Sequence, residues 1–278
     1  MSRLESLAQP LHPEVVAMLE AQRLAGAKSR SAMTIDETRQ AMLAGRTWQQ
    51  EPPQIESVDT DVNGIRVRLY GPECGQSLLY LHGGRFFSGD LESHDWPLRL
   101  FAAESGWRIC AVDYRLAPEH RHPVALEDAI SAGRWLANRT DRLQIAGDSA
   151  GGYLAALASL ELRPEGQILI YPMLDPACDT ASYREYWQGP WPNGEDMKRG
   201  WDLYGGTPVI AHLGPFPPTV LIVAGVDSLR DEALRFAESL GTPVTTYRFP
   251  DMHHGFFTQT KLSRSRELIH MLAFELRR

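Results

Sequence analysis

Short apolar runs alternate with helical stretches along most of this sequence, and this alternation constrains the fold more than any other feature. The runs are "SLLYLH", "RICAVD", "RLQIAG", "QILIYP", "TVLIVAG" and "PVTTYRF", and the stretches between them include "VALEDAISAGRWLANR" and "SLRDEALRFAESL". Strands connected by helices form a mainly parallel sheet with helices on both faces. The sequence therefore predicts an α/β fold, and its 278 residues suffice for one large domain with an appendage.

The N-terminal part precedes this alternation. Residues 12–27 carry apolar side chains at roughly helical spacing, and Thr34 and Glu37 have the spacing of a capping box before a second helix. Next, "IESVDTDV" and "IRVRLY" flank Asn63-Gly64, a pair typical of a two-residue hairpin turn. We therefore expect a helical N-terminal segment followed by an antiparallel hairpin.

Residues 172–218 interrupt the alternation with a segment rich in Pro, Gly, Trp and Tyr. Such a segment can be an elaborate surface loop, but its aromatic density favours a lid or cap that shapes an apolar pocket. The aromatic side chains could accept an aromatic or short aliphatic group, or they could form the core of the cap itself. They are Tyr183, Tyr186, Trp187, Trp191, Trp201 and Tyr204.

Ser149 gives the sharpest chemical signal. It lies between an apolar strand and an apolar helix, with Gly147 and Gly151 completing a G-x-S-x-G arrangement. A serine on a tight strand-to-helix turn has a strained backbone, and small neighbours two residues away relieve the crowding. The N-terminus of the following helix offers N–H groups to an oxyanion. The pattern predicts that Ser149 is a nucleophile.

A serine nucleophile needs a base that is itself oriented by an acid, and in this fold class both follow the serine in the chain. Asp227 comes directly off the strand "VLIVAG" and is favoured as the acid over Asp231 and Glu232, which lie inside the following helix. His254 follows the last apolar strand and is favoured as the base over the adjacent His253.

The stretch "LHGGRFFSG", residues 81–89, begins as a strand and ends in a loop upstream of the predicted nucleophile. Hydrolases of this architecture build the second part of their oxyanion hole there. Gly83 and Gly84 would let backbone N–H groups approach a carbonyl oxygen, and the N–H of Ala150 would complete the set. Arg85 has two interpretations: a neighbouring carboxylate braces it, or it lines the pocket and favours substrates that bear a carboxylate or another acceptor.

The composition limits the partners that we expect. A net charge of −7 gives no attraction to nucleic acid or to anionic membranes. Cys74, Cys110 and Cys178 are widely spaced, which predicts neither a disulfide framework nor a zinc site and is typical of a reducing compartment. No apolar run approaches the roughly 18 residues of a membrane span, and no export signal is visible. We expect a cytoplasmic protein.

Five motifs occur in a characteristic order: "HGG" at His82 to Gly84, "DYRLAPEH" at Asp113 to His120, "GDSAGG" at Gly147 to Gly152, "DSLRDEA" from Asp227, and "HGF" at His254 to Phe256. In these motifs the chain resembles the hormone-sensitive-lipase-like group of α/β-hydrolase esterases, often called bacterial family IV. The resemblance covers nearly the whole chain. It implies an α/β-hydrolase fold with an eight-stranded sheet and a helical cap. The expected cap segments are residues 1–50 and an insertion at about 172–218, and the expected core is 51–278.

The resemblance also implies an activity. It assigns Ser149, Asp227 and His254 to the hydrolysis of small short-acyl carboxylic esters without a cofactor or metal, and it allows a homodimer through a sheet edge. Arg115 and Glu119 of "DYRLAPEH" would brace neighbouring loops, unless they form an ordinary surface ion pair.

Two departures from the family and two rival functions stay open. The family commonly has a third glycine where this chain has Arg85, and the stretch from Tyr204 to Pro218 is shorter than usual. An amide hydrolase of the arylformamidase type shares the fold, and "HGGRF" does not exclude it. A non-catalytic small-molecule-binding member of the fold is the second rival.

Overall fold

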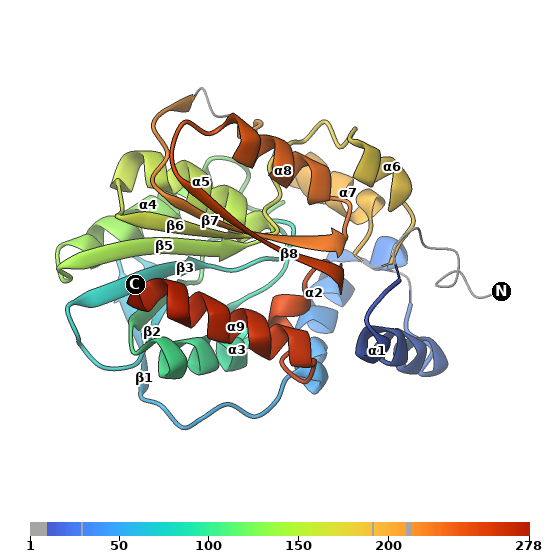
Figure 1. Ribbon diagram of the computed structural model, residues 1–278, viewed down its shortest axis with the longest axis horizontal. Helices are drawn as coiled ribbons and strands as arrows, with labels where there is room; N and C mark the ends of the chain where they lie inside the picture. Colours follow the sequence, from blue (N-terminus) through green and yellow to red (C-terminus); the bar gives the residue numbers. More distant parts are fainter. Residues whose placement is uncertain (1–9, 29, 191, 210–212) are drawn as a thin grey trace.

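The computed structural model describes residues 10–28, 30–190, 192–209 and 213–278, which form an eight-stranded sheet flanked by helices (Figure 1). Trp191, one of the aromatic residues expected in the cap, lies outside the described residues. The strands are β1 (Ser57–Val62), β2 (Ile65–Tyr70), β3 (Gln76–Leu81), β4 (Arg108–Val112), β5 (Arg142–Asp148), β6 (Gly166–Ile170), β7 (Thr219–Val226) and β8 (Val244–His253). Their order in the sheet is β1-β2-β4-β3-β5-β6-β7-β8.

The strand directions follow the predicted pattern. β2 pairs antiparallel with β1 and with β4, and the other neighbouring pairs are parallel. Asn63 and Gly64 have φ angles of 56° and 84°, so both residues of the β1–β2 turn adopt the left-handed conformation that such hairpins require. The predicted hairpin, the mainly parallel sheet and the α/β-hydrolase fold are confirmed.

Helices cover both faces of the sheet (Figure 1). One face carries α3 (Leu91–Ser105) and α9 (Ser263–Arg277), and the other carries α4 (Val124–Ala137), α5 (Ala150–Leu162) and α8 (Arg230–Ser239). Successive side chains of a strand point to opposite faces. In β3, Leu79 and Leu81 therefore join the core on the α4–α5 side, whereas Leu78 and Tyr80 join the core on the α3–α9 side. Burial on both faces explains why the central strands β3 to β7 are mostly apolar, whereas the edge strand β1 keeps polar side chains.

Four helices lie beyond the carboxyl ends of β7 and β8 in Figure 1. They are α1 (Pro13–Leu24), α2 (Ile35–Ala44), α6 (Ala181–Glu185) and α7 (Gly194–Tyr204). The predicted capping box is present, since the Thr34 side chain accepts the Glu37 N–H and the Glu37 carboxylate accepts the Thr34 N–H. Arg199 of α7 donates to the Met33 carbonyl at 2.8 Å, which joins the two segments expected to form the cap. The division into cap and core stays a prediction.

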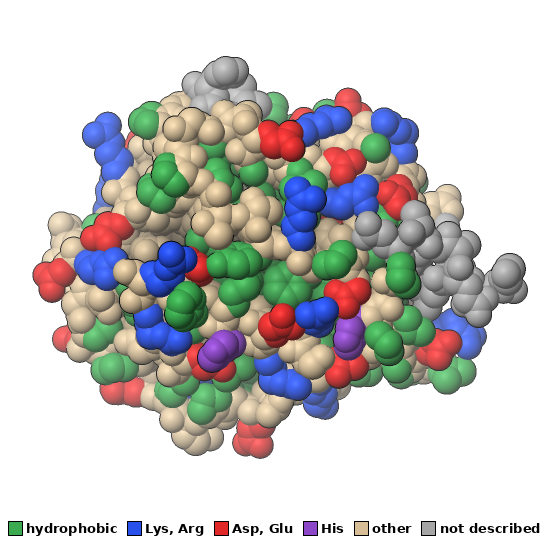
Figure 2. Space-filling view, viewed as in Figure 1, with side chains coloured by type: hydrophobic (Ala, Val, Ile, Leu, Met, Phe, Trp, Pro, Cys, Tyr) green, Lys and Arg blue, Asp and Glu red, His purple; other side chains and the backbone are tan. Residues whose placement is uncertain are grey.

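The surface in Figure 2 mixes acidic and basic side chains, with apolar side chains between them. This distribution accords with a net charge of only −7 over 278 residues. Within the described ranges, no helix combines the length and the apolarity that crossing a membrane requires.

Candidate active site

Ser149 lies on a sharp turn between β5 and α5. Its φ of 56° and ψ of −119° are unfavourable for a residue with a side chain. A Cβ at Gly147 would lie 2.2 Å from the Gly151 carbonyl oxygen, and a Cβ at Gly151 would lie 1.9 Å from the Leu81 carbonyl oxygen. The glycines of the G-x-S-x-G motif are thus required by close backbone contacts around the serine, as the sequence predicts.

The loops after β5, β7 and β8 bring Ser149, Asp227 and His254 together. His254 Nε2 is 2.9 Å from Ser149 Oγ, and His254 Nδ1 is 2.8 Å from Asp227 Oδ2. All three residues are buried. The carboxylate accepts the Nδ1 proton, which leaves Nε2 free to accept the proton of the serine hydroxyl. This arrangement can turn Ser149 into a nucleophile.

The competing acids point elsewhere. Asp231 Oδ2 accepts the Ser182 N–H at 2.7 Å, and Glu232 Oε1 accepts the Leu174 N–H at 2.7 Å. Burial raises the pKa of Glu232 well above its ordinary value, so its carboxyl group is suited to staying protonated. Both residues fasten the segment after β6 to α8 rather than orienting a base.

The competing histidine is also engaged away from the serine. His253 Nε2 donates to Gln259 Oε1 at 3.0 Å, and burial lowers the pKa of His253 to about 4. His253 is therefore neutral near pH 7 and helps to hold the 253–259 loop.

The loop after β3 requires one correction to the predicted oxyanion donors. The Gly83 N–H donates to Asp148 Oδ1 at 2.8 Å, so it is committed within the protein and is not available as predicted. A Cβ at Gly84, whose φ is 136°, would lie 1.8 Å from the Ser88 carbonyl oxygen. The loop therefore needs glycine at position 84, and the donor roles of Gly84 and Ala150 stay predictions.

Asp148 is a site residue that we did not predict. Besides the Gly83 N–H, its Oδ1 accepts the Tyr80 hydroxyl at 2.8 Å and lies 3.3 Å from His94 Nε2. Burial opposes ionisation of this carboxyl, but His94, Tyr80 and Gly83 outweigh it and lower the pKa of Asp148. Asp148 thus links the nucleophile turn to the loop between β3 and α3, residues 82–90, which we call the oxyanion loop. Its position next to Ser149 was the available signal, because a charged residue at the buried end of a strand needs partners.

Arg85 is buried beside a carboxylate. Its Nη1 lies 3.7 Å from Asp196 Oδ1 of α7, its Nη2 donates to Ser88 Oγ at 3.3 Å, and its guanidinium lies 5.0 Å from the ring centroid of Phe87. Its φ of 56° falls in the left-handed region that favours glycine. Asp196 supplies the carboxylate required by the bracing interpretation, and no sequence pattern connected it with Arg85. Arg85 also borders the cavity beside Ser149, so its role toward the substrate stays a prediction.

A cavity of about 90 Å³ adjoins Ser149 and His254. Met42 and Trp48 line it from the N-terminal segment, and Met197 lines it from α7. Apolar walls next to a nucleophile suit a short apolar group.

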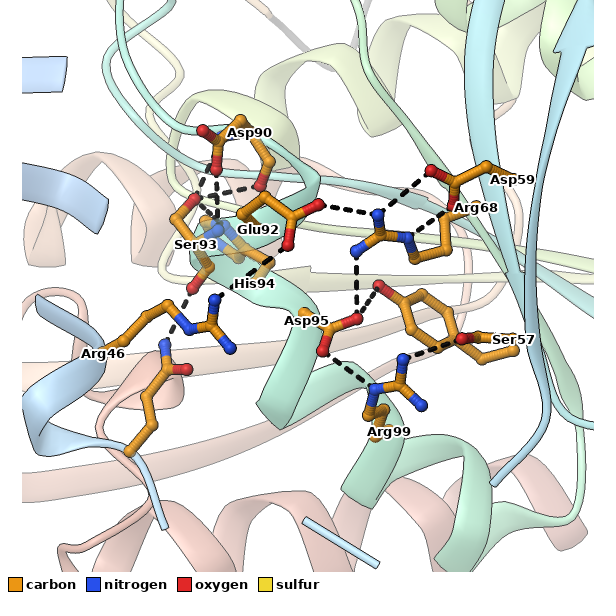
Figure 3. A network of polar contacts seen from close by, with 12 residues as sticks. Arg46, Ser57, Asp59, Arg68, Asp90, Glu92, Ser93, His94, Asp95 and Arg99 are labelled. Carbon is orange, nitrogen blue, oxygen red and sulfur yellow. Dashed lines mark hydrogen bonds and ion pairs between the residues drawn. The ribbon is translucent and has the colours of Figure 1, made fainter. Parts of the chain in front are cut away.

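A polar network fixes α3 beside this cavity (Figure 3). Arg68 of β2 donates to Asp59 of β1 and to Glu92 and Asp95 of α3, at 2.6 to 3.1 Å. Gln49 Nε2, at the end of the N-terminal segment, donates to the Ser93 carbonyl at 2.8 Å. The hairpin and the N-terminal segment therefore both hold the start of α3.

The "DYRLAPEH" residues have separate partners. Arg115 Nη2 donates to Asp128 Oδ1 at 2.7 Å, and Glu119 accepts two hydrogen bonds from Arg39 of α2 at 2.7 and 2.9 Å. Hydrogen bonds from Arg39 lower the pKa of Glu119 to about 2. Arg39 also donates to the Phe87 carbonyl at 2.9 Å, so Glu119 acts on the oxyanion loop through α2.

Among the residues that the structure describes, no group of three or more His, Cys, Asp and Glu side chains could hold a metal ion.

Comparison with known proteins gives consistent matches. A family model described as alpha/beta hydrolase fold matches residues 78–258. An ethyl acetate hydrolase of Pseudomonas putida is 31% identical, with 88% of this chain and 92% of that protein aligned. Esterase LipI of Mycobacterium tuberculosis is 34% identical over 73% of this chain and 76% of that protein. A hyperthermophilic esterase from the archaeon Pyrobaculum calidifontis has a TM-score of 0.85 at 30% identity, covering 96% of this chain and 98% of that one.

Proposed function

The chain belongs to the alpha/beta hydrolase fold family, in its hormone-sensitive-lipase-like group, and from this premise we propose that it is a serine esterase for small, short-acyl carboxylic esters. The observation that carries the proposal is the pair of hydrogen bonds that joins Asp227, His254 and Ser149. The cavity of about 90 Å³ supports a short acyl group, as does the similarity to an ethyl acetate hydrolase.

The first half of the reaction acylates the serine. As Ser149 Oγ attacks the ester carbonyl carbon, His254 Nε2 takes the hydroxyl proton, and Asp227 stabilises the resulting imidazolium. The N–H groups of Gly84 and Ala150 stabilise the oxyanion. His254 then gives the proton to the leaving alkoxide oxygen, so the alcohol departs and an acyl-serine ester remains.

The second half releases the acid. His254 deprotonates a water molecule, which attacks the acyl carbon, and the carbon–Oγ bond breaks as Ser149 recovers its proton. Water is the only co-reactant. The cycle therefore consumes one ester and one water and yields one alcohol and one carboxylic acid.

Steady-state hydrolysis of p-nitrophenyl acetate and butyrate tests this proposal. We expect the wild-type protein to hydrolyse both esters and Ser149→Ala to lose at least about 10⁴-fold in kcat. Unchanged circular dichroism would show that the variant is folded. Turnover retained by Ser149→Ala would contradict the proposal, and faster cleavage of N-formylkynurenine than of the esters would favour the amide hydrolase.

Three finer points are proposals of the same kind. We propose a helical cap formed by residues 1–50 and about 172–218, a cytoplasmic location and a homodimer. Fractionation of the native host and light scattering of the purified protein measure the last two.

A further inference from the structure

The oxyanion loop contains two consecutive residues with unfavourable backbone angles. Arg85 has φ of 56° and Phe86 has φ of 65°. Residues with a Cβ rarely adopt this left-handed region, and two in succession persist only where the surroundings hold them. Because both residues follow Gly84 in the same loop, the contacts that hold them also restrict where the Gly84 backbone lies.

Helix α7 lies directly against this loop. The Phe86 ring stacks on Tyr204 of α7 with centroids 4.1 Å apart and an interplanar angle of 10°, and it lies 5.0 Å from Trp201. A Cβ at Gly200 would lie only 2.7 Å from the Arg85 carbonyl oxygen and 2.8 Å from its Cβ. The helix therefore contacts the backbone of the strained residues.

A buried ion pair adds charge to this contact. Arg85 is 3% exposed and Asp196 is 1% exposed, and their closest charged atoms are 3.7 Å apart. The Asp196 N–H donates to Asn193 Oδ1 at 3.0 Å, so the start of α7 fixes the position of this residue. Burial lowers the pKa of Arg85 to about 10, which still leaves it protonated at neutral pH beside Asp196. Loss of either charge would remove the counter-charge that this ion pair supplies to the other buried side chain.

We propose that Asp196 is a positioning residue for the esterase reaction: through Arg85 it clamps the oxyanion loop to α7 and so aims the Gly84 N–H at the ester carbonyl oxygen. The proposal rests on the proposed function and adds a coupling between the expected cap and the oxyanion hole. Arg85 also borders the cavity beside Ser149, and the proposal assigns it a role through Asp196 rather than through the substrate. Since Asp196 balances the guanidinium charge, the site has no preference for anionic esters.

Kinetics of five variants, one of them a control, test the proposal. Asp196→Asn should lower kcat about ten- to a hundredfold, the range expected when a group that acts in the transition state is misplaced, with KM changed less than about threefold. The affinity for a trifluoromethyl ketone, which forms the tetrahedral oxyanion, should fall in parallel with kcat. Glu195→Gln is the matched control, because Glu195 is the exposed neighbour in the same turn of α7, and it should keep wild-type kinetics.

A second substitution, at position 85, makes the test specific for the Arg85–Asp196 pair. In an Arg85→Gly background, Asp196→Asn should change kcat less than about threefold, because glycine adopts a positive φ without a clamp and no guanidinium is left behind. Gly200→Ala is a second route to the same effect, since its Cβ pushes the Arg85 backbone without removing a charge. It should lower kcat at nearly constant KM even if Asp196→Asn does not fold.

Three results would overturn the proposal: wild-type kcat in folded Asp196→Asn or Gly200→Ala, equal effects of Asp196→Asn in both backgrounds, or a loss in Arg85→Gly confined to anionic esters. The last would mean that Arg85 binds substrate. Failure of the proposed function is distinct, because it would show as absent ester turnover in the wild-type protein. A double-mutant cycle on thermal unfolding would then still measure the coupling of Arg85 and Asp196, and additive effects would refute it.

Discussion

At the scale of single residues, His253 and His254 are adjacent, yet the fold sends them to different partners. His254 lies between Ser149 and Asp227, whereas His253 donates to Gln259. Substituting His254 and substituting His253 should therefore have different effects on activity, although both side chains are buried.

We predict that His254→Gln lowers kcat for p-nitrophenyl butyrate by at least about 10⁴-fold, since no base then accepts the serine proton. His253→Gln keeps the polar side chain beside Gln259 and should stay within about threefold of wild type. Initial rates at saturating ester measure both. A larger loss in His253→Gln than in His254→Gln would reverse the assignment of the base.

The sequence singled out the three residues that the structure joins by hydrogen bonds, because their order along the chain follows the order of the loops. The sequence could not show which of Gly83 and Gly84 has an N–H group available to an oxyanion. The two glycines are alike in sequence, and the difference between them arises from Asp148, which takes the Gly83 N–H. It also could not connect Arg85 with Asp196, because the pair depends on how α7 docks.

At the scale of elements, α2, which precedes the core in the sequence, also holds the oxyanion loop, as α7 does from the later insertion. Arg39 Nε donates to the Phe87 carbonyl at 2.9 Å, and Arg39 Nη2 donates to the Ala117 carbonyl at 3.1 Å and to Glu119 at 2.7 Å. One side chain thus joins the N-terminal segment to two loops of the core.

We predict that Arg39→Met lowers the free energy of unfolding by about 1–3 kcal/mol, the value expected when charged hydrogen bonds are lost. Methionine keeps much of the apolar stem, so the change isolates the guanidinium. Urea unfolding followed by circular dichroism measures the effect, with Arg235→Met on the exposed side of α8 as the control. Equal midpoints for the two variants would show that Arg39 does not hold the segment.

The sequence predicted the elements that have local signals, but it did not predict how these elements pack against one another. The capping box at Thr34 and the Asn63-Gly64 turn are set by neighbouring residues. The contact of α2 with Phe87 spans residues far apart in the chain and has no local pattern.

At the scale of the whole molecule, the alternating pattern sufficed for the parallel part of the sheet, because the central strands β3 to β7 are largely buried on both faces and the helices between strands return the chain to the same edge. That edge gathers Ser149, Asp227 and His254. The pattern does not encode how two buried histidines, His82 and His253, affect stability.

Burial lowers the pKa of both His82 and His253 to about 4. The unfolded chain binds protons on these side chains near pH 6.5, so unfolding takes up protons between about pH 6.5 and 4. Stability should therefore fall as the pH drops through this window, by up to about 1.4 kcal/mol per pH unit for each histidine. Urea unfolding of His253→Gln across this range should give a shallower dependence than wild type, and parallel curves would contradict the prediction.

The proposed reaction requires that Ser149 is the activated nucleophile of an ester hydrolase. The most direct measurement is peptide mass spectrometry after treatment with a p-nitrophenyl phosphonate, which transfers its phosphonyl group to an activated serine with release of p-nitrophenolate. We predict one phosphonyl group per chain on the peptide that contains Ser149, with loss of esterase activity in proportion to labelling. Full labelling at another residue, or an unlabelled Ser149 in an active enzyme, would contradict this role of Ser149.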